Sequence, residues 1–174
     1  MLKPDQLAKS GTEHGHQSAL FAFVAVAHWH GFGAAKVWAS GGDLPARDPD
    51  QPPALPCLKW FHAIHNQGHG DKIRGARAKA EGVKKGVADT FLPWPVYEPC
   101  PSDPQLMIVK WCGLYIEMKK PSEKPKRETS KGGVSDEQAE FGKFAKGAGY
   151  GWCVCYGWQE AAQMLENYIN FKGG

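Results

Sequence analysis

The sequence lacks three features that would mark a membrane, secreted or polybasic protein. Its longest nearly apolar stretch, residues 19–27, is shorter than the roughly 18 residues that cross a bilayer, so we expect no membrane contact. The first residues contain no apolar signal core, and five cysteines are an odd number, which favours a cytoplasmic protein with reduced thiols. The 21 Lys and Arg residues exceed the 18 Asp and Glu residues by three, which excludes a uniformly basic chain but not local basic patches.

What the sequence does contain is typical of one globular domain. It has 174 residues, of which 42% are hydrophobic, and seven tryptophans, so a sizeable core can form. Proline marks the loops, because it fixes φ and cannot donate to a strand ladder. Of the 13 prolines, five lie in 45–56 and five in 93–104. We therefore expect a single domain over residues 1–174, with Pro-rich loop insertions near 40–56 and 93–104.

Between these loops, the spacing of apolar residues predicts helices and strands. Ser10 and Glu13 fit a capping box at the start of the first helix, whose inward face would carry Glu13, Gln17, Leu20 and Val24. The expected helices are 12–30, 72–81, 135–148 and 159–171, and the expected strands are 57–66, 87–92, 106–111, 114–119 and 151–156. This order predicts an α/β domain with a mixed sheet flanked by helices.

Three charged residues lie in strand segments that are otherwise apolar. Asp89 lies in GVADTFL, and Glu117 and Lys119 lie two residues apart in LYIEMKK, so the latter two point to the same face of a strand. Burying such charges is costly unless they are paired or bind a metal. Two carboxylates with a lysine suit Mg²⁺ or Mn²⁺ and phosphodiester hydrolysis. Taken alone, the same residues also fit an ion pair on a surface strand.

A wider set of motifs accompanies these residues in one order along the chain. It comprises Glu13 with Gln17, Ile64-His65-Asn66, EGVKKGVAD at 81–89, YIEMK at 115–119 and VSDEQ at 134–138. Over residues 10–170 this set resembles the VRR-NUC domain, the virus-type replication–repair nuclease branch of the PD-(D/E)xK superfamily. The resemblance implies a restriction-endonuclease-like core. It also implies a divalent-metal-dependent DNA endonuclease that acts on branched DNA, such as a Holliday junction, in DNA repair.

The resemblance also implies roles for individual residues. Asp89 and Glu117 would be the catalytic, metal-binding carboxylates, with Mg²⁺ or Mn²⁺ as the cofactor. The backbone carbonyl of Met118 and the carboxylate of Glu13 would complete the metal site. Lys119 would be the catalytic lysine.

Gln138 would be a catalytic polar residue on the helix that follows these strands. Local alternatives exist for two of these residues, because Glu13 also fits a capping box with Ser10, and Gln138 fits one with Ser135. The family usually has proline before the aspartate, where this chain has Ala88. Proline at that position shapes the backbone and not the chemistry, so we expect activity to survive.

Two basic segments flank the proposed carboxylates. Residues 71–85 hold six basic residues against two acidic ones, and residues 117–131 hold six against three. Such segments are often solvated surface, but beside a phosphate-cleaving site they would bind the DNA backbone without reading bases. The expected DNA-binding residues are Lys72, Arg74, Lys84, Lys85 and Lys120.

The expected partners follow from the same resemblance. It implies branched DNA as the substrate, and it implies that a stand-alone domain acts as a homodimer. Two other interpretations remain open. One is a catalytically silent nuclease-fold module that binds DNA or serves in assembly. The other is a zinc-stabilised protein of unrelated function, although its histidines and cysteines lack the tight paired spacing of zinc sites.

Overall fold

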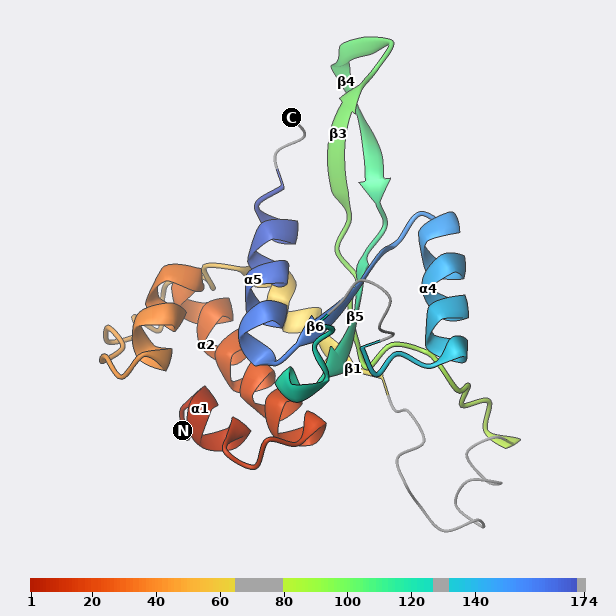
Figure 1. Cartoon of the computed structure of the whole chain (residues 1–174). Helices are drawn as coiled ribbons and strands as arrows, with labels where there is room; N and C mark the ends of the chain where they lie inside the picture. Colours follow the sequence, from red (N-terminus) through yellow and green to blue (C-terminus); the bar gives the residue numbers. More distant parts are fainter. Residues whose placement is uncertain (65–79, 127–131, 172–174) are drawn as a thin grey trace.

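A computed structural model describes residues 1–64, 80–126 and 132–171 of the chain (Figure 1). Its helices are α1 (Pro4–Ala8), α2 (Glu13–Ala39), α4 (Asp136–Gly147) and α5 (Trp158–Ile169). Two short 3₁₀ turns are η1 (Pro56–Trp60) and η2 (Pro121–Glu123). Its strands are β1 (His62–Ala63), β2 (Thr90–Leu92), β3 (Val96–Cys100), β4 (Asp103–Trp111), β5 (Leu114–Lys119) and β6 (Gly151–Tyr156).

The central sheet contains four strands in the order β1-β2-β5-β6. β2 pairs antiparallel with both β1 and β5, whereas β5 and β6 run parallel. The expected mixed sheet flanked by helices is therefore confirmed. Because β5 is an inner strand, its residues have strand neighbours on both sides.

Helices cover both faces of this sheet (Figure 1). On one face α2 and α5 contact each other and β5, and Leu20, Ile116 and Leu165 are fully buried there. On the other side α4 contacts β6, where Gly142 lies against Trp152. A Cβ at Gly142 would come within 2.7 Å of the indole ring, so only glycine permits this close approach.

The two faces of β5 differ in polarity. Ile116 and Met118 belong to the apolar core, whereas Tyr115 packs edge-on against Phe141 of α4, with ring centroids 5.1 Å apart. Glu117 lies two residues after Tyr115 and therefore shares its face. The strand is buried on both sides, and its polar residues face the gap between the sheet and α4.

β3 and β4 form a separate two-stranded hairpin that projects beyond the rest of the domain (Figure 1). This hairpin differs from the sequence prediction in two ways. The loop expected over 93–104 contains β3, and the strand expected at 106–111 already begins at Asp103 and pairs with β3. Pro99 is tolerated in β3 because both strands are edges, where a missing N–H can face solvent.

Three other predicted boundaries were wrong. In the strand expected at 57–66, residues 57–60 belong to η1, which Pro56 begins. Of its described residues, which end at 64, only His62–Ala63 form β1. The strand expected at 87–92 begins at Thr90. The helix expected at 12–30 continues to Ala39 across a break at Gly31, where φ is 81°. Residues 72–79 of the expected basic helix lie outside the described residues.

The other predicted elements agree with the structure, whereas α1 and η2 were not predicted. β5 and β6 have the expected bounds, and α4 and α5 agree within two residues at each end. By length and composition α2 would be long and apolar enough to cross a membrane, a property that buried core helices share. In this domain Ala19, Leu20 and Ala27 of α2 are fully buried against the rest of the fold.

Candidate active site

Strand pairing brings Asp89 next to Glu117, although 27 residues separate them in the sequence. Thr90 of β2 pairs with Ile116 of β5 in the antiparallel register, so Asp89, directly before β2, lies opposite Glu117. The Met118 N–H donates to Asp89 Oδ2 at 2.7 Å, and the Ile64 N–H donates to the Asp89 carbonyl oxygen at 2.7 Å. Two neighbouring strands therefore hold Asp89 in place.

Lys119 links two carboxylates from different elements. Its Nζ lies 3.0 Å from Glu117 Oε1 and 3.7 Å from Glu13 Oε1 at the start of α2. The side chain of Glu117 is only 1% exposed, whereas that of Glu13 is 45% exposed. The cluster of these three side chains is therefore buried at Glu117 and open to solvent at Glu13.

Gln138 connects this group to α4 and serves two purposes at once. Its Oε1 accepts a hydrogen bond from the Ser135 N–H at 2.9 Å, and its own N–H donates to Ser135 Oγ at 3.2 Å, which is a capping box. Because Oε1 faces the cap, Nε2 faces the sheet and donates to Glu117 Oε1. The two interpretations of Gln138 from the sequence are therefore compatible.

Glu117 is an unusual carboxylate because burial opposes its charge. Burial, and next the negative charge of Asp89, raise the pKa of Glu117 to about 8, and the attraction of Lys119 offsets only part of this. Within the described structure, Glu117 Oε2 is buried and accepts no hydrogen bond. A buried carboxylate oxygen without a partner is costly, so this atom is a natural position for a cation.

Lys119 responds in the opposite way. Burial alone would lower its pKa, but the carboxylates of Glu117, Glu13 and Asp89 outweigh burial and raise the pKa above its ordinary value. Lys119 is therefore an ammonium at neutral pH. It can donate hydrogen bonds and stabilise negative charge, but it is a poor base.

Gly86 sets the path of the segment that leads to Asp89. Its φ of +79° is a conformation that side chains rarely adopt, and a Cβ there would lie 2.6 Å from the carbonyl of Glu137 in the first turn of α4. The segment can approach α4 closely only because residue 86 is glycine. The sequence prediction missed this positioning role, for which the glycine three residues before Asp89 was the available signal.

The structure places the remaining predicted site residues as follows. The capping box predicted between Ser10 and Glu13 was wrong, because Thr12 caps α2 through Oγ1, which accepts from the Gly15 N–H at 3.0 Å. Glu13 is thereby left to contact Lys119. The side chain of Met118 is buried in the core, so only its backbone could serve a metal.

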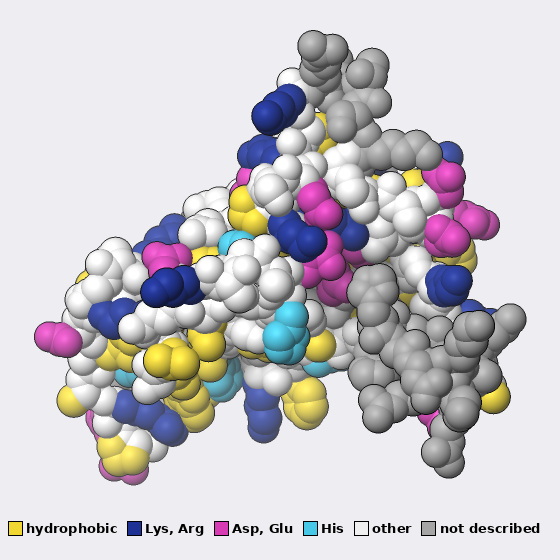
Figure 2. Space-filling model, turned by 60° about the horizontal axis from the view of Figure 1, so that its bottom comes forward, with side chains coloured by type: hydrophobic (Ala, Val, Ile, Leu, Met, Phe, Trp, Pro, Cys, Tyr) yellow, Lys and Arg dark blue, Asp and Glu magenta, His cyan; other side chains and the backbone are white. Residues whose placement is uncertain are grey.

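The predicted DNA-binding residues are only partly described. Lys84 and Lys85 are exposed on the segment that leads to Asp89, and Lys120 is half-buried directly after Lys119. Figure 2 shows the molecule with the bottom of the Figure 1 view turned forward, and acidic and basic side chains lie side by side near the middle of this face. Lys72 and Arg74 lie outside the described residues.

The fit of a divalent cation depends on two carboxylates. Among residues 1–64, 80–126 and 132–171, no three or more His, Cys, Asp or Glu side chains form a group that could hold a metal ion. Mg²⁺, however, is commonly held by one or two carboxylates and several waters. Asp89 and the buried Oε2 of Glu117 meet that requirement, so the donor set fits Mg²⁺ or Mn²⁺.

Comparison with known proteins adds evidence on the fold. No protein-family model and no curated protein matches the sequence. Among solved structures, the chain is similar to a VRR_NUC domain protein with a TM-score of 0.51 and 18% sequence identity. The match covers 93% of this chain and 91% of that one. At this identity the likeness shows a shared fold over nearly the whole chain.

Proposed function

We propose that this protein is a nuclease of the PD-(D/E)xK type that uses Mg²⁺ or Mn²⁺ to hydrolyse phosphodiester bonds in DNA. The observation that carries the proposal is the buried Glu117, which lies beside Asp89 and Lys119 and whose Oε2 has no hydrogen bond to any described residue. A carboxylate that only stabilised the fold would be satisfied by its neighbours. The likeness in fold to a VRR_NUC domain protein supports a nuclease-type domain.

The metal would be held by Asp89 and Glu117, with the Met118 carbonyl as a further ligand. Glu13, whose exposed side chain contacts Lys119, would join them only by moving when the metal binds. A bound divalent cation would lower the pKa of a water and stabilise charge on the scissile phosphate. Glu13 is the most exposed of these groups, so the phosphate would enter from its side.

The chain's own residues would prepare the site for this chemistry. Gln138 donates to Glu117 through Nε2 while Oε1 remains in the cap, so the capping box fixes the position of the donor that orients the carboxylate. Lys119, as an ammonium, would orient the attacking water and stabilise the extra negative charge of the transition state. Lys84, Lys85 and Lys120 would bind phosphates on either side of the cut.

Branched DNA is the proposed substrate class, and it follows from the sequence resemblance. The lysines near the site suit any phosphate backbone, since they carry no base-reading pattern. Selection among linear, flap and four-way DNA would therefore depend on the shape of the nucleic acid.

Cleavage of labelled linear, flap and four-way DNA with Mg²⁺, Mn²⁺ or EDTA tests the proposal. We expect metal-dependent cleavage, with a loss of about 100-fold or more in Asp89→Asn and Lys119→Ala. Glu166→Gln is the control, because this partly exposed glutamate pairs with Lys36 on the surface. Cleavage in EDTA, or full activity of both site variants, would refute the mechanism.

Metal binding by the wild type and by the Asp89→Asn variant distinguishes a nuclease from a catalytically silent module. A silent module would bind DNA equally with and without metal, and would bind Mn²⁺ no better than Asp89→Asn does. Titration of Mn²⁺ by calorimetry measures this difference directly. Stoichiometric zinc that survives dialysis would instead support the zinc-stabilised alternative.

A further inference from the structure

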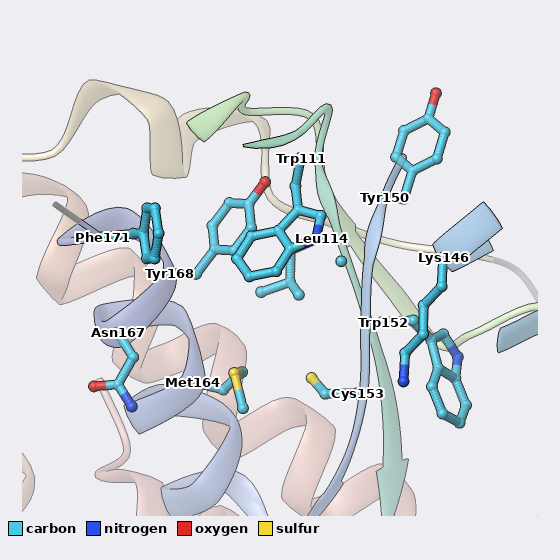
Figure 3. Close-up of a pocket in the computed structure, with 11 residues that line it drawn as sticks. Trp111, Leu114, Lys146, Tyr150, Trp152, Cys153, Met164, Asn167, Tyr168 and Phe171 are labelled. Atoms are coloured by element: carbon cyan, nitrogen blue, oxygen red, sulfur yellow. The ribbon is translucent and has the colours of Figure 1, made fainter. Parts of the chain in front are cut away.

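A cavity of about 540 Å³ lies between α5, β6 and the end of β4 (Figure 3). This volume is within the range of roughly 300–1,000 Å³ that is typical of small-molecule sites. The cavity lies at the start of β5 and β6, where Leu114 pairs with Gly151, whereas Glu117 and Lys119 lie at the end of β5. It is therefore a separate feature from the candidate active site.

Three aromatic rings form one wall of the cavity. The indole of Trp111 stacks on Tyr168 with ring centroids 6.0 Å apart, and its centroid lies 5.7 Å from that of Phe171. Tyr168 is buried, and its hydroxyl donates to the Trp94 carbonyl oxygen at 2.8 Å, which fixes the ring. Trp111 and Phe171 are partly exposed and can contact a ligand. Aromatic walls of this kind favour planar ring systems, which bind by stacking.

Two polar side chains complete the lining that a ligand can use. Asn167 Oδ1 accepts a hydrogen bond from Gln163 Nε2 at 2.9 Å, and the amide nitrogen of Asn167 lies on the cavity side (Figure 3). That nitrogen can donate to an acceptor on the edge of a ring. Lys146 lines the cavity from α4 and is exposed, and its Nζ lies 5.4 Å from the ring centre of Trp152.

The charge of the lining favours an anion. Among the described residues that line the cavity there is no Asp or Glu, so Lys146 makes the lining positive. Lys110 also lies near the aromatic wall, with Nζ 4.6 Å from the ring centre of Phe171, but its ion pair with Glu98 neutralises it. The cavity therefore suits a planar ring that has hydrogen-bond acceptors and carries a negative charge.

The arrangement of these groups also restricts the shape of the ligand. In Figure 3 the rings of Trp111, Tyr168 and Phe171 lie on one side of β6, and Lys146 lies on the other side. An anion at Lys146 must therefore be joined to the stacked ring by a spacer. A nucleotide meets this requirement, because its sugar separates the base from the phosphate.

We propose that this cavity binds a free nucleoside monophosphate. The base would stack on the aromatic wall and accept a hydrogen bond from Asn167 Nδ2, and the phosphate would pair with Lys146. This inference goes beyond the proposed nuclease function and does not depend on it. Binding can be measured in EDTA, so a failure of this proposal and a failure of the nuclease proposal are distinguishable.

Calorimetric titration of the whole protein in EDTA with three compounds tests the proposal. We expect deoxyadenosine monophosphate to bind at one molecule per chain. Deoxyadenosine should bind about tenfold more weakly because it lacks the phosphate, and inorganic phosphate should bind at least a hundredfold more weakly because it lacks the ring. Asp89→Asn should bind the nucleotide as the wild type does, since Asp89 lies at the candidate active site.

Two exposed residues of the lining provide the variants. Lys146→Gln and Asn167→Asp should each weaken binding of the nucleotide about tenfold, and Lys146→Gln should leave the affinity for deoxyadenosine unchanged. Lys143→Gln and Asn170→Asp are the matched controls, because Lys143 and Asn170 are exposed close by in sequence but do not line the cavity. Both controls should bind as the wild type does, and urea denaturation checks that every variant folds.

Several results would overturn the proposal. One is a wild type that does not bind the nucleotide at millimolar concentration, whether or not it binds single-stranded DNA. Another is inorganic phosphate that binds as tightly as the nucleotide. Unchanged affinity in both Lys146→Gln and Asn167→Asp would also overturn it. Loss of binding in Asp89→Asn would place the nucleotide at the candidate active site instead of the cavity.

Discussion

Replacing Glu117 by glutamine should change how the stability of the metal-free protein depends on pH. In the folded protein this carboxyl has a pKa of about 8, against an ordinary value of 4.5, because it is buried beside Asp89. Between these two pH values the folded protein holds the proton more strongly than the unfolded chain does. The free energy of unfolding therefore falls as the pH rises, and the stabilisation present below pH 4.5 is lost once the pH passes 8.

The size of the effect follows from the two pKa values. Full ionisation of Glu117 costs the folded protein about 5 kcal/mol. Between the two pKa values, the free energy of unfolding falls by up to about 1.4 kcal/mol per pH unit. Its side chain is 1% exposed, so solvent does not screen this cost. Glutamine cannot ionise, and we expect the Glu117→Gln variant to lack this slope.

Urea denaturation of both proteins from pH 5 to pH 9 in EDTA measures the slopes. Glu166→Gln should keep the wild-type slope, because this residue lies on the surface of α5. With Mn²⁺ at about 100 times its Kd, the wild type should gain about 2.7 kcal/mol, and Glu117→Gln should gain little. Equal pH slopes for wild type and Glu117→Gln would refute the buried, unsatisfied carboxylate on which the candidate site depends.

Further variants test the surroundings of the site and, at Tyr168, a hydrogen bond elsewhere in the fold. Gly86→Ala should lower the free energy of unfolding by about 1–3 kcal/mol, measured by denaturation, and should reduce cleavage. Gly82→Ala is the control, because residue 82 has a φ of +90° but no atom within 4 Å of the new Cβ. This control should lose less stability, since it adds backbone strain without a steric clash. Gln138→Glu keeps the capping box but removes the donor to the buried carboxylate, so we expect impaired cleavage with helix stability retained. Ser135→Ala should show the reverse, with a loss of about 1 kcal/mol in stability and normal cleavage. Tyr168→Phe removes a hydroxyl that donates to a main-chain carbonyl at 2.8 Å, and should lower the free energy of unfolding by about 1 kcal/mol without affecting cleavage.

Local signals were sufficient for several elements. β5 and β6 were predicted with their bounds because they are short, mainly apolar runs flanked by turn residues. α4 was predicted because Ser135 and Gln138 form a capping box at its start. In each case the residues that define the element lie within it or next to it.

Elements whose form depends on distant partners were predicted poorly. The apolar segment that follows Pro56 has strand-like composition, but it forms η1 against α2, and only two of its described residues pair with β2. Proline was interpreted as a loop signal in 93–104, yet β3 accommodates Pro99 because it is an edge strand. A sequence does not state whether a strand will be central or at an edge.

The sequence by itself determined which chemistry is available, because Asp89, Glu117 and Lys119 are charged residues in apolar surroundings. Tertiary structure alone decided that they meet and that Glu13 joins them, since strand register and the entry of α2 set those contacts. It also decided that one oxygen of Glu117 has no hydrogen-bond partner among the described residues, and that Gln138 bonds both to the helix cap and to the carboxylate. The physical reason is that burial, and hence the cost of a charge, belongs to the packed fold and not to any residue.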